Sequence, residues 1–135
     1  MTGDTRLMWG ITLVTVPTIV YGGLTVLGIV SNGRMGMPAP HDLTPLQTTF
    51  YRAGHAHAGV LLILSLLVQL ALDEANLPVS WVWPLRVVVV ASVLLVSGGF
   101  FAVAHAPGLR AILYAGALSL SAVVLAVGIG LIRAR

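Results

Sequence analysis

Residues 53–72, AGHAHAGVLLILSLLVQLAL, form an apolar run that lies between Arg52 and Asp73 and contains no Asp, Glu, Lys or Arg. A helix needs about 20 residues to cross the hydrocarbon core of a bilayer, so this run is long enough to span a membrane. Its apolar residues are continuous rather than alternating, a pattern that favours a helix over a barrel strand. We therefore expect a transmembrane helix over residues 48–72.

Three further gaps between charged residues each contain at least 20 mostly apolar residues. They predict spans at about residues 7–30, 85–106 and 110–132. Only 8% of the 135 residues are charged, against about a quarter in a soluble domain, which excludes an ordinary soluble fold. The expected fold is all-α, an integral membrane four-helix bundle that forms a single transmembrane domain over residues 1–135.

The charges also predict how the bundle sits in the bilayer. An even number of spans places both termini on one side, with four of the seven arginines, and this arrangement predicts cytoplasmic termini in the cell (inner) membrane. We interpret the arginines as anchors at the lipid bilayer and expect no nucleic-acid partner. The chain has no cysteine, which excludes disulfides, thiolate metal sites and covalently attached haem.

The connections and small residues predict how the helices pack. Residues 31–47, SNGRMGMPAPHDLTPLQ, form the only long loop, and its prolines and glycines indicate an irregular, stiff cap. The last two spans are joined by little more than Pro107 and Gly108, which indicates a tight hairpin. Pro17 is expected to bend the first span. A small-residue stripe in the last span predicts a homo-oligomer or a larger membrane complex: Ser119, Ala122, Ala126 and Gly130.

The four histidines are predicted to gather at one membrane face. His55 and His57 lie near the start of the second span, His105 lies at the end of the third, and His41 lies in the long loop between the first two spans. The topology brings all these positions to the same side. Polar groups inside membranes are functional-site hypotheses by default. We therefore expect a histidine-lined pocket near the non-cytoplasmic face.

Helix geometry separates the two paired histidines. Residues i and i+2 point about 200° apart, so His55 and His57 cannot hold one ion from a regular helix. One should face the bundle interior and the other a different neighbour. A site that combines one of them with His105, joined by His41 or Asp42, is expected.

Three chemistries fit this set. Imidazoles on two helices are the usual ligands of b-type haem, for which the candidates are His55, His57 and His105. Imidazole with carboxylate suits a transition metal such as zinc, and a metal ion would be held by His41, Asp42, His55 and His105; Met35 and Met37 would suit Cu(I). A cofactor-free pocket would use histidine for proton transfer and the arginines of this face (Arg34, Arg52 and Arg110) for an anionic or polar substrate.

The stretch GHAHAGVL, residues 54–61, resembles the G-H-x-H helix segment of haem–copper oxidases and nitric oxide reductases. In that family the two histidines point to opposite sides of one helix and bind two different haems. The resemblance covers about ten residues and implies that His55 and His57 are haem ligands. We do not expect a complete oxygen- or nitric-oxide-reducing centre, because the further helices of that family and their histidines are missing.

The chain is also similar in length and span number to the hydroxylaminobenzene mutase family. The run Arg34, Met35 and Gly36 follows the first span, and His57 with Gly59 opens the second, as in that family; Ala58 stands where the family has an acidic residue. This resemblance implies a cofactor-free isomerase with His57 as acid–base and Arg34 as substrate anchor.

Three functions therefore remain open from the sequence. The leading hypothesis is a small four-span protein whose histidine pocket binds b-type haem or a metal ion for redox or ligand-sensing work. The second is the cofactor-free membrane isomerase. The third is an accessory subunit of a larger membrane complex, in which the histidines satisfy local polar contacts.

Overall fold

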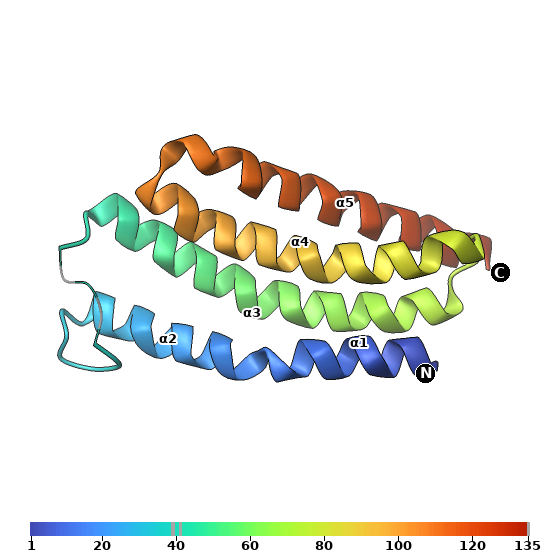
Figure 1. Ribbon diagram of the computed structural model, residues 1–135, viewed down its shortest axis with the longest axis horizontal. Helices are drawn as coiled ribbons and strands as arrows, with labels where there is room; N and C mark the ends of the chain where they lie inside the picture. Colours follow the sequence, from blue (N-terminus) through green and yellow to red (C-terminus); the bar gives the residue numbers. More distant parts are fainter. Residues whose placement is uncertain (39, 41, 135) are drawn as a thin grey trace.

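The computed structural model describes the chain except for residues 39, 41 and 135. The described part is an all-α four-helix bundle, as expected from the sequence. Figure 1 shows the spans side by side in chain order, with both termini at one end and the long loop at the other. The elements are α1 (Gly3–Val14), α2 (Val16–Val30), α3 (Pro45–Glu74), α4 (Val79–His105), the short 3-10 helix η1 (Pro107–Leu109) and α5 (Arg110–Arg133).

Four helices in the described part of the chain are long and apolar enough to cross a membrane, with α1 and α2 together forming the first. The protein is therefore an integral membrane protein with four spans. The first three spans start earlier than predicted, at Gly3, Pro45 and Val79, whereas α5 starts at Arg110 as predicted. At α3, the Thr44 side chain accepts a hydrogen bond from the Gln47 backbone N–H, and the Gln47 side chain accepts one from the Thr44 N–H. This capping box satisfies backbone donors at the helix start and fixes it at Pro45.

The start of α4 also differs from the prediction, which placed it after Pro84. The helix begins at Val79 and contains Pro84 in its second turn. A proline removes one backbone hydrogen bond and clashes with the residue four positions earlier, and this penalty is severe only in a helix interior. Pro84 lies inside α4, close to its start, so the missing hydrogen bond affects only the short segment that begins at Val79.

The first span is broken where Pro17 predicted a bend. Helix α1 ends at Val14, Thr15 lies between the helices, and α2 starts at Val16 with Pro17 in its first turn. Threonine hydroxyls donate to carbonyls around the break: Thr15 Oγ1 to Thr12 O at 2.7 Å and Thr18 Oγ1 to Thr15 O at 2.6 Å. The same two carbonyls also accept backbone N–H groups, from Thr15 and Thr18 at 3.1 and 3.0 Å, so the hydroxyls add a second hydrogen bond at the break.

Helices α4 and α5 approach each other through glycines. A Cβ added at Gly99 would lie 2.8 Å from Leu113 Cα, and one added at Gly116 would lie 2.8 Å from Val96 N. A side chain at either position would push the two backbones apart. The tight hairpin expected at Pro107 is confirmed by η1, which joins these helices directly.

Two residues of the small-residue stripe of α5, Ser119 and Gly130, pack within the chain, whereas Ala122 is exposed. Ser119 Oγ lies 2.8 Å from Ser92 Oγ of α4, and a Cβ at Gly130 would lie 2.9 Å from Leu77 in the α3–α4 connection. These stripe positions are thus occupied by the protein itself. They give no support to an oligomer, which stays a prediction.

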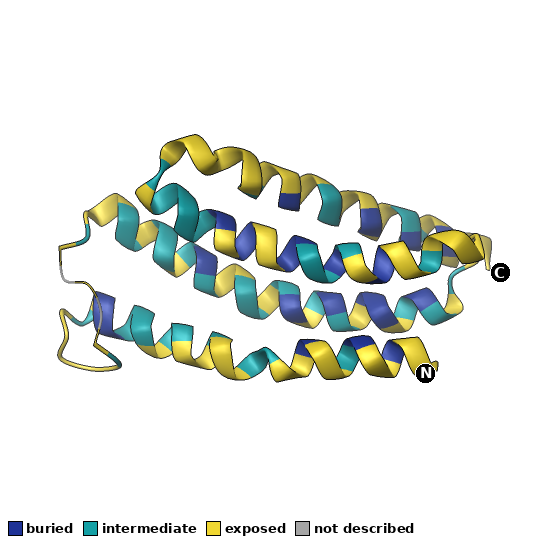
Figure 2. Cartoon of the chain, viewed as in Figure 1, coloured by how far each residue is buried: buried dark blue, intermediate teal, exposed yellow. Residues whose placement is uncertain are grey.

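The hydrophobic core lies in the half of the bundle that holds the termini. It is formed by the late part of α3, the early part of α4 and the late part of α5, with the buried residues Val68, Leu72, Leu85, Val89, Val123 and Val127. Figure 2 shows the buried positions along the facing sides of these helices. The opposite half, near the long loop, contains the histidines.

Candidate functional site

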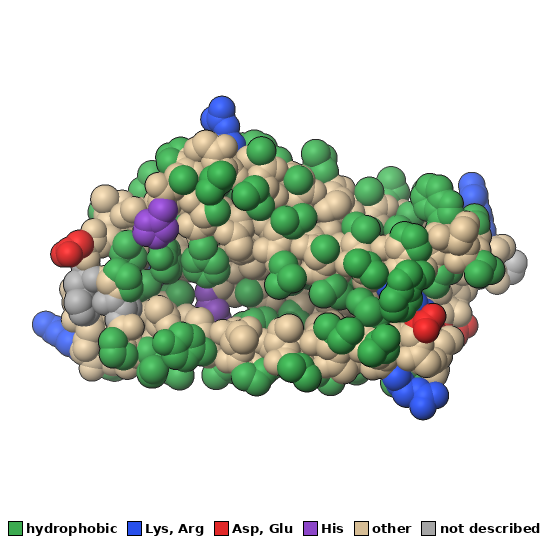
Figure 3. Space-filling view, viewed as in Figure 1, with side chains coloured by type: hydrophobic (Ala, Val, Ile, Leu, Met, Phe, Trp, Pro, Cys, Tyr) green, Lys and Arg blue, Asp and Glu red, His purple; other side chains and the backbone are tan. Residues whose placement is uncertain are grey.

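The three described histidines lie at the long-loop end of the bundle, as predicted. His55 and His57 occupy the third and fourth turns of α3, and His105 is the last residue of α4. Figure 3 shows histidines (purple) toward this end, and charged side chains (blue and red) confined to the two ends. His41 lies outside the described residues.

His55 faces the first span. A Cβ added at Gly23 of α2 would lie 2.9 Å from both Cε1 and Nε2 of the His55 ring, and one at Gly22 would lie 3.8 Å from Nδ1. The ring is only partly exposed. The two glycines therefore leave space for the imidazole ring, which packs directly against the backbone of α2 with Nε2 close to Gly23.

His57 faces the opposite side of α3, in agreement with the angle between positions i and i+2. Its Nδ1 lies 2.8 Å from the Ala53 carbonyl, and its ring packs on Phe100 of α4 with a centroid separation of 4.7 Å. A carbonyl oxygen only accepts hydrogen bonds, so Nδ1 carries the hydrogen. In the neutral ring, Nε2 then holds a lone pair, and it has no partner within the described part of the chain.

His57 lines an open groove of about 360 Å³ between α3, α4 and α5. The groove is lined mainly by apolar and aromatic side chains, among them Leu61, Phe100 and Tyr114. A neutral imidazole with an unoccupied nitrogen at such a groove can bind a metal centre or accept a proton.

His105 pairs with Tyr51 instead of joining the other histidines. The Tyr51 hydroxyl and His105 Nε2 share a hydrogen bond of 2.9 Å, and the Tyr51 ring also packs edge-on against Phe101 at 5.2 Å. This pair connects the first turns of α3 to the end of α4. The three described histidines thus have three different sets of neighbours.

The metal-binding set expected from the sequence is only partly described. Within residues 1–38, 40 and 42–134, no three His, Asp or Glu side chains are grouped closely enough to hold a metal ion. Asp42 and Arg34 are exposed in the long loop, and neither lines the groove of His57. The metal site and the substrate role of Arg34 stay predictions.

The RMG run has a local structural role. Gly36 adopts φ +81°, and a Cβ there would lie 2.7 Å from Gly28 N of α2. The next residue, Met37, donates its N–H to Leu24 O at 3.0 Å. Only glycine suits such a position. Gly36 therefore folds the loop back onto the end of α2.

A buried polar network at the opposite end was not predicted. Arg86, taken as a surface anchor from the sequence, has a side chain only 2% exposed and forms an ion pair of 2.6 Å with Asp73, whose side chain is 8% exposed. Arg86 Nη1 also donates to Gln69 O and Oε1, at 3.1 and 3.0 Å. The pair removes the cost of burying a single charge, which is why Arg86 stays inside the bundle.

The network also attaches the first span to the other helices. Thr5 Oγ1 and Thr2 Oγ1 donate to Asp73 Oδ1 at 2.6 and 2.9 Å, and Trp9 Nε1 donates to Leu66 O at 3.1 Å. One sequence signal could have revealed it. Gln69 interrupts an apolar run and lies four residues before Asp73, on the same helix face.

No protein-family model, no curated protein and no solved structure matches the chain.

Proposed function

We propose that this four-span membrane protein binds b-type haem at the groove between α3, α4 and α5, with His57 as the axial ligand. The observation that supports it is the hydrogen bond from His57 Nδ1 to Ala53 O. Histidines that bind metals usually donate their other ring N–H to a carbonyl or carboxylate, which fixes the tautomer and the orientation of the ring. His57 is already held in that state.

The groove suits a flat apolar group. Its lining is mainly hydrophobic, and Phe100 holds the His57 ring from one side. When bound, b-type haem would supply an iron centre that transfers electrons or takes a small ligand. His57 is the only histidine among the described residues that line the groove. His57 would then be the single histidine that holds the haem in this groove, and we propose that the chemistry supplied there would be ligand sensing and not electron transfer.

His55 and His105 have supporting roles in this proposal. His55 spaces α3 from α2 beside Gly22 and Gly23, and His105 holds the ends of α3 and α4 together through Tyr51. Neither ring lines the groove. Of the three haem ligands predicted from the sequence, the proposal therefore assigns the iron to His57 alone.

The test is a haem titration of the purified protein in detergent, followed by its visible spectrum. The wild-type protein and His105→Ala should develop a Soret band with saturable binding, and His57→Ala should not. Free imidazole should restore the band in His57→Ala, because it replaces the missing ligand. The proposal fails if His57→Ala binds haem as tightly as the wild-type protein, or if no variant shows saturable binding.

A second candidate, the cofactor-free isomerase, is favoured by the lone pair on His57 Nε2. At this position the ring could accept and return a proton from an apolar aromatic substrate in the groove, near the Tyr114 hydroxyl. This function predicts a colourless protein that converts hydroxylamino-arenes, and whose turnover is lost in His57→Ala. Because Arg34 does not line the groove, Arg34→Ala should retain turnover.

We infer that the termini face the cytoplasm of the cell membrane. The support is the small excess of arginines on the side of the termini, which include Arg6, Arg86 and Arg133. If Arg86 is discounted because its charge is neutralised in a buried ion pair, three arginines remain on each side and the excess disappears. Reporter fusions at the C-terminus and within residues 31–38 would decide between the two orientations.

A further inference from the structure

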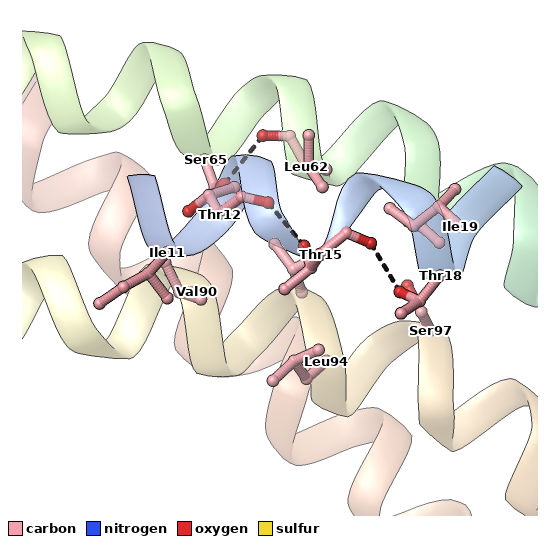
Figure 4. A pocket seen from close by; sticks show the side chains of 12 residues that line it. Ile11, Thr12, Thr15, Thr18, Ile19, Leu62, Ser65, Val90, Leu94 and Ser97 are labelled. Carbon is pink, nitrogen blue, oxygen red and sulfur yellow. Dashed lines mark hydrogen bonds between the residues drawn. The ribbon is translucent and has the colours of Figure 1, made fainter. Parts of the chain in front are cut away.

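A cavity of about 160 Å³ lies between the first span and helices α3 and α4. It is separate from the groove of His57, with which it shares no lining residue. Its lining comes from the middle of each helix: Thr15 at the break of the first span, Leu62 in α3 and Val93 in α4. The cavity therefore lies near the middle of the bilayer. Figure 4 shows Thr15 and Leu62 among the side chains around it.

The broken first span builds one wall of the cavity. Thr12, Thr15 and Thr18 line it, and each hydroxyl donates to a carbonyl of its own helix segment. Irregular backbone at membrane depth is tolerated where it is buried in protein or lines a cavity, and broken helices of transporters form substrate sites in this way. The break in the first span therefore forms part of the wall of a cavity that is large enough to hold a small molecule.

Ser97 is the exceptional polar group in this lining. Its Oγ is buried without a hydrogen-bond partner, and the residue is 8% exposed. Four other serines within the helices donate to a carbonyl of their own helix: Ser65, Ser92, Ser119 and Ser121. An unsatisfied buried hydroxyl destabilises a protein, because it has lost its hydrogen bonds to water and gained none in their place. A ligand that brings an acceptor oxygen would satisfy it.

We propose that this cavity binds a neutral six-membered-ring molecule that carries a carbonyl oxygen, as ketones and quinones do, and that Ser97 donates a hydrogen bond to that oxygen. The size follows from a known comparison, since an apolar protein cavity of about 150 Å³ binds benzene. The neutrality follows from the lining, which contains no ionisable side chain. We infer a carbonyl oxygen on the ligand because the Ser97 hydroxyl has no hydrogen-bond acceptor within the protein.

The test uses two fluorinated compounds of similar shape, 4-fluoroacetophenone and 4-fluoroethylbenzene, which differ in the acceptor oxygen. Their binding to the full chain in nanodiscs is followed by 19F NMR, with empty nanodiscs as the reference for partition into lipid. The wild-type protein should bind the ketone more tightly than the hydrocarbon. Ser97→Ala should weaken ketone binding about fivefold, the effect of one hydrogen bond, and leave hydrocarbon binding unchanged.

Ala58→Leu provides a second test, because Ala58 lines the cavity and a larger side chain would fill it. This variant should lose both compounds. Ala122→Leu, at an exposed position of α5, is the matched control and should retain both. Circular dichroism checks that each variant is folded. The proposal is overturned if the ketone binds no better than the hydrocarbon, if Ser97→Ala binds both as the wild-type protein does, or if Ala58→Leu retains ketone binding.

Discussion

The substitution Asp73→Ala should strongly weaken the attachment of the first span to the rest of the bundle. It removes the carboxylate that accepts hydrogen bonds from Arg86 Nη2, Thr5 Oγ1 and Thr2 Oγ1. The Arg86 side chain, only 2% exposed, would then carry a buried charge with no counter-ion. Because Thr2 and Thr5 belong to the first span and its approach, loss of Asp73 also releases the N-terminal end of that span.

The size of the effect follows from the contacts that remain. Removing one partner of a buried ion pair destabilises a protein by about 3–5 kcal/mol. Arg86 Nη1 keeps its two bonds to Gln69, so we expect the lower end, about 3 kcal/mol. Asp73→Asn keeps an acceptor oxygen and loses only the charge, and it should destabilise by about 1–2 kcal/mol, since bonds to charged groups are stronger than neutral ones.

The assay is equilibrium unfolding in detergent by titration with SDS, followed by circular dichroism. Glu74→Ala is the matched control, because this neighbouring carboxylate is exposed, and it should change the free energy of unfolding by less than about 0.5 kcal/mol. Adding Arg86→Met to Asp73→Ala should recover part of the loss, since no unpaired charge remains. Equal stability of Asp73→Ala and Glu74→Ala would refute the buried network as a stabilising contact.

Three other substitutions can be measured by the same titration. Gly116→Ala should destabilise the protein by about 1–3 kcal/mol, because the added Cβ would lie 2.8 Å from Val96 N. Gly128→Ala is the control: its Cβ would meet no atom within 4 Å, so this variant should be neutral or stabilising. Equal effects of the two substitutions would contradict the close α4–α5 contact. Gly36→Ala should destabilise by about 1–3 kcal/mol through its positive φ, and a neutral result would show that the loop has another conformation. Tyr51→Phe should lose about 1 kcal/mol with the hydrogen bond to His105 and keep its ring packing; a loss above about 3 kcal/mol would point to a larger role.

The spans could be predicted because burial in lipid depends on simple chain properties. Long runs without charge determine where a helix crosses a membrane, and the opposite directions of His55 and His57 on α3 follow from helix periodicity alone. The break at Thr15 was likewise foreseeable from Pro17. These features are local, so they need no knowledge of which helices touch.

The contacts of Arg86 and of the histidines could not be predicted in this way. Reading every charge as the end of a span placed Arg86 and Asp73 at the surface, whereas the structure buries both because each neutralises the other across the α3–α4 hairpin. The partners of His55, His57 and His105 depend on how each helix is rotated about its axis. That rotation is set by glycines and aromatic rings of other helices, which lie far away in the sequence. The residue pattern of a single helix therefore does not predict it.

The two ends of the bundle differ in how many hydrogen bonds their polar side chains form within the protein. At the end with the termini, Asp73, Gln69 and Thr5 form hydrogen bonds with one another or with Arg86, next to the hydrophobic core. At the other end, His57 keeps a free nitrogen beside an open groove. Binding and conformational change tend to occur in the less stable parts of a protein. Arg86 Nε is buried without a partner, but the other contacts of the network hold three helices together. The network therefore acts as the rigid anchor, and ligand chemistry is expected at the histidine end, where the helices can adjust to a bound group.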